Sequence, residues 1–174
     1  TETVLSEISE NCKMIFPSTH VVFEGKDSLV RDIKEDYETF PTLPYAAGKT
    51  KNEEQIKKSG KNYIILRLAS VYGYSTDTMR LNIMTNLFSQ IASQNGTIKL
   101  FAGGKQLKCL VPLIDVARCF KFMEERTDIK FQIFNLSKDN VTVEQVANIC
   151  KKVNPKVKIV KTKDKIPNLG YALS

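Results

Sequence analysis

The run "YIILRLA", residues 63–69, constrains the fold more than any other stretch of this sequence. Its apolar residues are close to continuous rather than alternating, as in a strand of a parallel β-sheet with both faces covered. Segments with helical patterns flank it, over 45–59 and 79–94. Strands that alternate with helices indicate an α/β protein in which helical layers cover a sheet.

The other elements follow from the same periodicities. The expected strands are 13–16, 97–101, 109–114, 131–137 and 156–161. The further expected helices are 2–11, 116–125 and one that begins at Thr142. Asp115 is expected to cap the second of these, and Gln145 to complete a capping box with Thr142. Pro17 is expected to end the first strand. Residues 26–44 read as irregular and residues 164–174 as an extended tail.

Length and composition narrow the functional classes. The 174 residues suit one compact domain. No apolar stretch approaches the roughly 18 residues of a membrane span, and the start does not resemble a signal peptide. The net charge is +7, but the lysines are scattered rather than interleaved with aromatic residues, so we expect neither nucleic-acid nor membrane binding. Four cysteines without a C-x-x-C and a single histidine predict free, buried thiols in a cytoplasmic protein, with no metal site.

Tyr45 and Lys49 lie four positions apart in "LPYAAGKTKNEE", so they share one face of the expected helix. A nearby ammonium favours the phenolate and lowers the pKa of a tyrosine, which can then move a proton at a hydroxyl or carbonyl. Ala46, Ala47 and Gly48 keep the helix slim enough for a flat ligand to approach. The pair by itself favours the alternative of an ordinary surface helix, because this spacing is common.

Hydroxyl side chains mark a second candidate site. Ser18 and Thr19 follow the expected strand 13–16, and ligands of open α/β sheets bind at the carboxyl ends of strands. The alternative is a turn whose hydroxyls satisfy their own backbone. Two further segments complete the set: "LRLASVYG" at the end of the next strand, and "GGKQLKCLVPLIDVARC", a glycine turn with basic residues before a strand and a helix.

In this order the motifs resemble the extended short-chain dehydrogenases, the NAD-dependent nucleotide-sugar epimerase/dehydratase group. "IFNLS", "TVEQVANI" and "LGY" fit the same pattern. The resemblance implies that Tyr45 is the catalytic acid/base and that Lys49 lowers its pKa and binds the nicotinamide ribose. It implies that Thr19, aided by Ser18, hydrogen-bonds the reacting sugar oxygen. Lys108 falls near the family's arginine for the nucleotide diphosphate, although lysine lacks the bidentate fork.

Other positions depart from the family pattern. Ser70, expected on the cofactor side, stands where the family often has Asn. His20 and Val21 occupy places where the dehydratases carry an acidic residue, which disfavours water elimination and leaves epimerase or reductase chemistry. "VFEG" is similar to the V-F-D-G of sugar-nucleotide reductases. His20 is a candidate substrate contact, with an ordinary loop residue as the alternative.

The sequence has no G-x-x-G-x-x-G phosphate loop. The resemblance therefore implies a partial Rossmann-like sheet without the glycine-rich βαβ half, and a chain that is inactive by itself. Residues 1–76 would be the later part of the NAD or NADP domain, and residues 77–174 mostly the small sugar-nucleotide subdomain. The family implies a nucleotide-diphosphate sugar as substrate and a homodimer formed through helices 45–59 and 2–11. The alternative is a catalytically silent truncated homologue that binds sugar nucleotides or another subunit.

Overall fold

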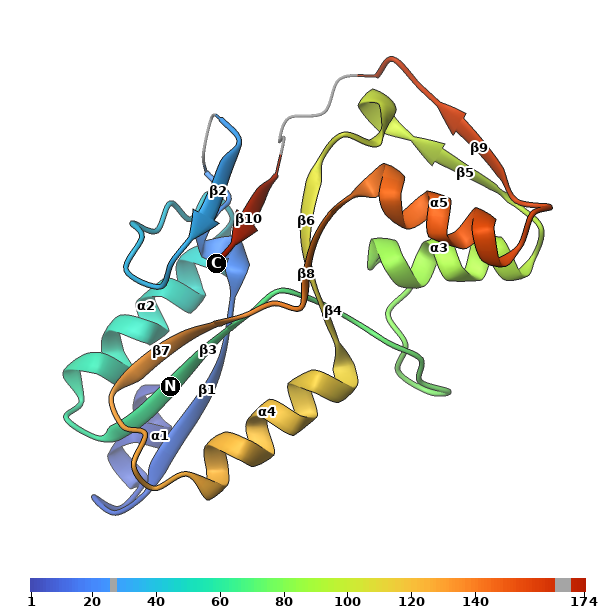
Figure 1. Cartoon of the computed structure of the whole chain (residues 1–174). Coiled ribbons are helices and arrows are strands. Elements are labelled where there is room, and N and C mark those ends of the chain that lie inside the picture. The colour runs from blue at the N-terminus through green and yellow to red at the C-terminus, as the bar shows by residue number, and fades with distance from the viewer. Residues whose placement is uncertain (26–27, 165–169) are drawn as a thin grey trace.

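Three parallel strands form the central sheet of the molecule: β1 (Lys13–Thr19), β3 (Asn62–Leu68) and β7 (Gln132–Leu136), in the order β1–β3–β7 (Figure 1). The structure is a computed structural model and describes residues 1–25, 28–164 and 170–174. β3 contains the run "YIILRL", and its residues Ile64, Ile65 and Leu66 are fully buried. The expected buried strand is therefore confirmed at the middle of the sheet.

Helices cover both faces of this sheet. Ile65 packs on one face with Leu5 of α1 (Glu2–Glu7) and Ile56 of α2 (Pro44–Lys58). Ile64 and Leu66 point the other way and pack with side chains of α4 (Leu113–Glu125), among them Met123. Figure 1 shows α1 and α2 on one side of the strands and α4 on the other. This sheet and its three helices are called the sheet lobe, and they confirm the predicted α/β class.

A second group of elements is called the small lobe. It contains the parallel pair β5 (Thr97–Leu100) and β9 (Lys158–Lys161), with α3 (Met84–Ser93) and α5 (Val143–Val153) packed against them. Three short strands connect the lobes: β4 (Ser70–Tyr72), β6 (Leu107–Pro112) and β8 (Asp139–Thr142), where β6 pairs with β8 antiparallel (Figure 1). The capping box of Thr142 and Gln145 is confirmed at the start of α5.

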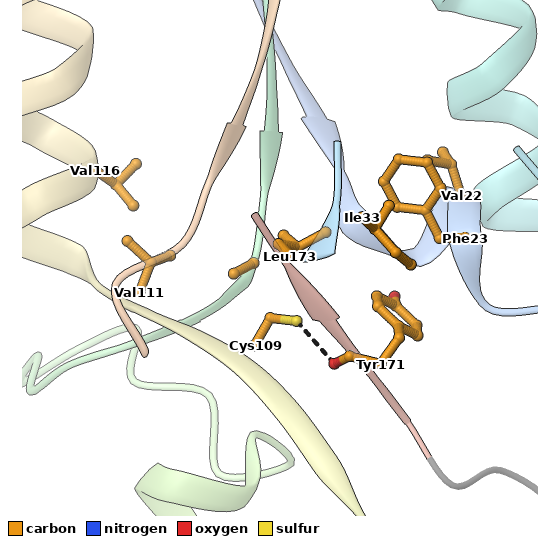
Figure 2. Packing of buried hydrophobic residues seen from close by; sticks show 9 residues of the cluster. Val22, Phe23, Ile33, Cys109, Val111, Val116, Tyr171 and Leu173 are labelled. Carbon is orange, nitrogen blue, oxygen red and sulfur yellow. Dashed lines mark hydrogen bonds between the residues drawn. The ribbon is translucent and has the colours of Figure 1, made fainter. Parts of the chain in front are cut away.

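Four strands lie where the sequence predicts none, and two of them, β4 and β8, belong to the connection between the lobes. β2 (Val30–Ile33) falls in the segment expected to be irregular, and β10 (Tyr171–Leu173) in the expected tail; the two pair in parallel. Part of that tail, 165–169, lies outside the described residues. Figure 2 shows how Ile33, Tyr171 and Leu173 bury their side chains together with Phe23. Tertiary burial thus gives strand structure to segments with little periodicity of their own.

Three local expectations are wrong. Pro17 lies within β1 rather than ending it, because β1 pairs with β3 alone among the described strands and a proline is tolerated at such an edge. Asp115 is not the helix cap: α4 begins at Leu113, so Asp115 lies in its first turn. α3 begins at Met84 instead of residue 79.

The cysteines are free, as predicted, but only Cys109 is fully buried, and Cys12 is exposed. Burial raises the pKa of the Cys109 thiol to about 11, so it remains protonated at neutral pH. Across the described residues, no helix combines the length and the apolar character that crossing a membrane requires.

Candidate active site

A cavity of about 560 Å³ opens where β1 and β3 end. It receives Ser18, Thr19 and His20 from the end of β1 and the 3₁₀ helix η1 (His20–Phe23), and Tyr45 from the start of α2. Its other lining residues come from η1, from the end of β3 and the segment after it, from the turn before α3, and from the starts of α3 and α4: Val21, Leu68 to Gly73, Ser75, Thr78 to Arg80, Ile83, Asn86 and Leu113. Its position at the carboxyl ends of parallel strands is typical of ligand sites in α/β proteins.

Tyr45 and Lys49 lie one turn apart on α2, as the sequence predicts. Pro44 occupies the first turn of that helix, where its missing N–H costs no hydrogen bond. The Tyr45 side chain is 58% exposed and lines the cavity. The Lys49 Nζ lies 5.9 Å from the centroid of the Tyr45 ring and 4.7 Å from that of Phe16. The helix therefore places a cation beside the phenol at the cavity mouth.

Lys49 is anchored by the strand as well. Its Nζ donates a hydrogen bond to the carbonyl oxygen of Pro17 at 2.6 Å. Partial burial lowers the pKa of Lys49, and Glu53, one turn further along α2, opposes that shift. The slim helix face near Gly48 is open: an added Cβ there would meet no atom within 4 Å in the described chain.

Ser18 belongs to a buried charged cluster that the sequence did not reveal. Its hydroxyl donates to Oε1 of Glu53 at 2.5 Å. Glu53 is only 2% exposed and Arg67 only 4%, and Arg67 Nη2 donates to Glu53 Oε2 at 2.8 Å. A second guanidinium nitrogen of Arg67 donates to the carbonyl oxygen of Glu35 at 2.9 Å. The pair ties α2 to β3 directly beneath the cavity.

The two hydroxyls at the end of β1 have different roles in hydrogen bonding. Because the Ser18 proton goes to Glu53, its oxygen can only accept from a ligand. The Thr19 oxygen accepts from the backbone N–H of Val21 at 3.2 Å and caps η1. Thr19 therefore satisfies the backbone of its own turn, as the alternative reading of the sequence expected. The same hydroxyl can still donate a hydrogen bond to a ligand.

His20 and Ser70 line two cavities. Both border the large cavity and also a smaller one of about 120 Å³, which is lined in addition by Lys108 and Tyr171. His20 Nε2 lies 3.4 Å from Ser70 Oγ, and His20 Nδ1 lies 2.7 Å from the Tyr171 hydroxyl oxygen. Burial, with a smaller contribution from Lys108, lowers the pKa of His20 to about 4. The imidazole is therefore neutral at pH 7.

The structure thus brings Ser18, Thr19, His20, Tyr45 and Ser70 to one cavity. Lys49 does not line this cavity, and its Nζ lies 5.9 Å from the centroid of the Tyr45 ring. Lys108 borders only the smaller cavity. Sequence reasoning missed Glu53, Arg67 and Tyr171. A signal existed for Arg67, since an arginine inside an apolar strand requires a buried partner. The roles given to these residues remain predictions.

Known proteins with a similar sequence profile or a similar structure agree with this fold. The profile of the RmlD substrate binding domain family matches residues 6–142. No protein with a curated function matches the chain. Solved structures do: UDP-glucose 4-epimerase from Thermotoga maritima, with UDP-glucose, superimposes with a TM-score of 0.83 at 21% identity, over 99% of this chain and 56% of that one.

Two further epimerase structures are similar. UDP-glucuronic acid 4-epimerase from Bacillus cereus, in complex with UDP-glucuronic acid and NAD, has a TM-score of 0.78 at 18% identity over 95% of this chain and 54% of its own. UDP-N-acetylglucosamine 4-epimerase from Methanobrevibacter ruminantium, in complex with UDP-N-acetylmuramic acid, has a TM-score of 0.76 at 21% identity over 93% and 53%.

The chain therefore spans little more than half the length of these structures. The family profile covers most of the chain, and the ordered motifs and the fold agree with it. The protein belongs to the RmlD substrate binding domain family, within the extended short-chain dehydrogenases.

Proposed function

We propose that this chain carries the proton-transfer residues and part of the sugar site of an NAD(P)-dependent nucleotide-sugar epimerase or reductase. The observation that carries the proposal is the placement of Tyr45, with the Lys49 ammonium near its ring, on the same cavity as Ser18 and Thr19. The substrate is proposed to be a nucleotide-diphosphate sugar, the ligand class named for the similar epimerase structures.

Tyr45 would act as acid and base at one sugar hydroxyl. The Lys49 ammonium lies 5.9 Å from the centroid of its ring, and in the proposed step the Tyr45 oxygen accepts the hydroxyl proton as that carbon becomes a carbonyl. In the reverse direction the phenol returns the proton to the carbonyl oxygen. Thr19 can donate a hydrogen bond to the same sugar oxygen, and Ser18 can only accept one, because its proton is held by Glu53.

The residues present fit one end of a nicotinamide dinucleotide. Tyr45 and Lys49 offer a hydroxyl and an ammonium for the nicotinamide ribose, and the open helix surface at Gly48 leaves room beside them. Ser70 lines the same cavity as Tyr45. When bound, the cofactor supplies the hydride acceptor or donor. The sequence holds no glycine loop for the diphosphate, so tight binding is proposed to need residues beyond those of this chain.

The test is Tyr45→Phe in the full-length gene product, assayed with a UDP-sugar and NAD(P). Removing a general acid/base typically costs about 10²–10⁴-fold, so we expect turnover to fall at least about 100-fold while sugar-nucleotide affinity stays within a few-fold. Tyr74→Phe is the matched control, because Tyr74 is exposed and lies outside the cavity lining. Turnover within a few-fold of wild type in Tyr45→Phe would remove Tyr45 from the mechanism.

A second candidate is a binding or subunit-interaction module without activity of its own. The lack of a glycine loop in this sequence favours it. Calorimetry with NAD(H) on the 174-residue chain tests the second candidate, whereas weak dinucleotide binding by this chain is expected under both candidates. A module would bind the sugar nucleotide but not the dinucleotide, whereas tight dinucleotide binding would exclude the second candidate.

We also propose a homodimer in which α1 and α2 pack against their mates, and a division of roles between residues 1–76 and 77–174. Val4 on α1 and Leu43 at the start of α2 are large apolar side chains exposed on these helices. Light scattering after gel filtration tests the dimer, and Leu43→Glu is expected to shift the mass toward the monomer.

A further inference from the structure

The imidazole of His20 is held from the far end of the chain. The hydroxyl oxygen of Tyr171, on β10, lies 2.7 Å from both His20 Nδ1 and the carbonyl oxygen of His20. On its other side, His20 Nε2 faces Ser70 Oγ at 3.4 Å, next to the large cavity. The ring therefore bridges a fixed phenol and the space proposed for the sugar.

The hydrogen-bond inventory assigns the tautomer. A carbonyl oxygen can only accept, so the single Tyr171 hydroxyl proton is donated to the His20 carbonyl. The Tyr171 oxygen can then accept a proton from Nδ1, and both contacts become hydrogen bonds. The other tautomer would have two acceptors compete for one proton. His20 is thus assigned Nδ1–H, which leaves a lone pair on Nε2 that faces Ser70.

Tyr171 is positioned by several independent contacts. Its ring packs edge-on against Phe23, with centroids 6.4 Å apart, and Cys109 Sγ donates to its carbonyl oxygen at 3.2 Å (Figure 2). Gly170 has a φ of +81°, and an added Cβ would come within 2.0 Å of the Leu107 carbonyl oxygen. Burial raises the pKa of Tyr171, so the phenol keeps its proton. Only glycine fits before Tyr171, and β10 is held close to β6.

The groups around the imidazole keep it neutral. Lys108 from β6 and Glu24 after η1 border the smaller cavity with His20, as do Cys109 and Ser70. Lys108 and burial both disfavour a second proton on the ring. A neutral ring with Nδ1 engaged presents Nε2 as an acceptor through the physiological pH range.

We propose that Tyr171 is a positioning residue that fixes His20 as the Nδ1–H tautomer, and that Nε2 with the Ser70 hydroxyl forms an acceptor site for a hydrogen-bond donor on the sugar. The ligand group is a hydroxyl or an amide N–H. A carboxylate is disfavoured there, because an anion would face a nitrogen lone pair without a proton. The acceptor role rests on the proposed sugar-nucleotide function, whereas the tautomer does not.

The single histidine makes the tautomer directly measurable. In protein labelled with ¹⁵N-histidine, long-range ¹H–¹⁵N correlation spectra at pH 7 show which ring nitrogen carries the proton. We expect Nδ1–H in the wild type and a shift of the majority to Nε2–H in Tyr171→Phe, which keeps the ring packing. Tyr37→Phe, which removes the hydroxyl of another tyrosine whose ring packs against Phe23, is the control and should not change the tautomer. An Nε2–H wild type overturns the proposal, even if Tyr171→Phe fails to fold.

The acceptor role is tested by adding UDP-glucose or UDP to the labelled protein. We expect UDP-glucose, but not UDP, to shift the Nε2 resonance. His20→Leu should bind UDP-glucose about tenfold more weakly, the effect of one lost hydrogen bond, and His20→Gln should stay within about threefold because its amide oxygen can accept near Nε2. Binding without an Nε2 shift overturns the acceptor site. A failure of UDP-glucose to bind at all counts against the proposed function and leaves the tautomer result standing.

Discussion

In the sheet lobe, a buried ion pair of Glu53 and Arg67 lies beneath the cavity, whereas the core of the small lobe is built from apolar side chains such as Phe88 and Ile98. The buried polar residues of the small lobe in the described chain, Thr85 and Asn86, lie at the start of α3, and Asn86 lines the cavity. In both lobes, buried polar side chains therefore occur near the cavity.

The difference has an energetic reason. A buried ion pair adds little net stability, because the loss of hydration offsets the attraction of its charges, but it fixes geometry. Here it fixes α2 against β3 and directs the Ser18 hydroxyl away from the cavity. The small lobe has only to fill space, which apolar side chains do at lower cost. The following predictions, from the largest effect to the smallest, test this contrast.

Arg67→Leu is expected to be the most damaging change. It leaves the Glu53 carboxylate buried without its guanidinium, which costs about 3–5 kcal/mol of unfolding free energy. The measurement is urea unfolding of Arg67→Leu, Glu53→Leu and the double variant. The double variant should lose clearly less than the sum of the two single variants, because no unpaired charge remains.

Ile98→Ala is the matched change in the small lobe. We expect a loss of about 2–5 kcal/mol from the cavity it leaves. In the double variant Ile98→Ala/Arg67→Leu, the two losses of unfolding free energy should add to within about 0.5 kcal/mol, because the two side chains lie in different lobes. Strict additivity of Glu53→Leu with Arg67→Leu would instead show that the ion pair does not act as a unit.

The junction of the lobes should respond to pH through His20. Its folded pKa of about 4 lies below the usual 6.5, so the unfolded chain binds the proton more readily. Stability is fully present above pH 6.5 and is lost as pH falls toward 4, by an amount on the order of 3 kcal/mol.

The measurement is urea unfolding at pH 7.5 and pH 4.5 in wild type and in His20→Gln, which cannot titrate. The carboxylates contribute equally to both proteins, so the difference between the two pH dependences isolates His20. Lys108→Met should reduce that difference, because Lys108 helps to lower the pKa of His20. Identical pH dependence in wild type and His20→Gln would contradict the buried neutral imidazole.

Gly48→Ala is the smallest expected effect. The position is exposed within α2 and an added Cβ meets no described atom, so the change should stabilise the chain by up to about 1 kcal/mol. Thermal unfolding at a concentration that keeps the chain monomeric measures it. A loss of stability at high concentration alone would show that a second chain packs closely against α2.

Several parts of the molecule could be predicted from sequence because their signals are local. The run of 63–69 gave the central strand, and Thr142 with Gln145 gave a helix start that the structure confirms. Tyr45 and Lys49 share a helix face because helix geometry requires it. That Tyr45 and Lys49 act together with Ser18 and Thr19 was implied by the family resemblance, and the structure brings Tyr45 to the same cavity as these two hydroxyls.

Other features depend on residues far apart in the chain. Tyr171 reaches His20 across 151 positions, and β10 becomes a strand only by pairing with β2. Glu53 and Arg67 each carry no periodic signal that names the other as partner. Hydrophobic periodicity thus determined where the main helices and the central strands form, because it reports which face of an element is buried. Only the tertiary structure decided which polar groups meet inside, because hydrogen bonds and ion pairs require contact distances that no local pattern encodes.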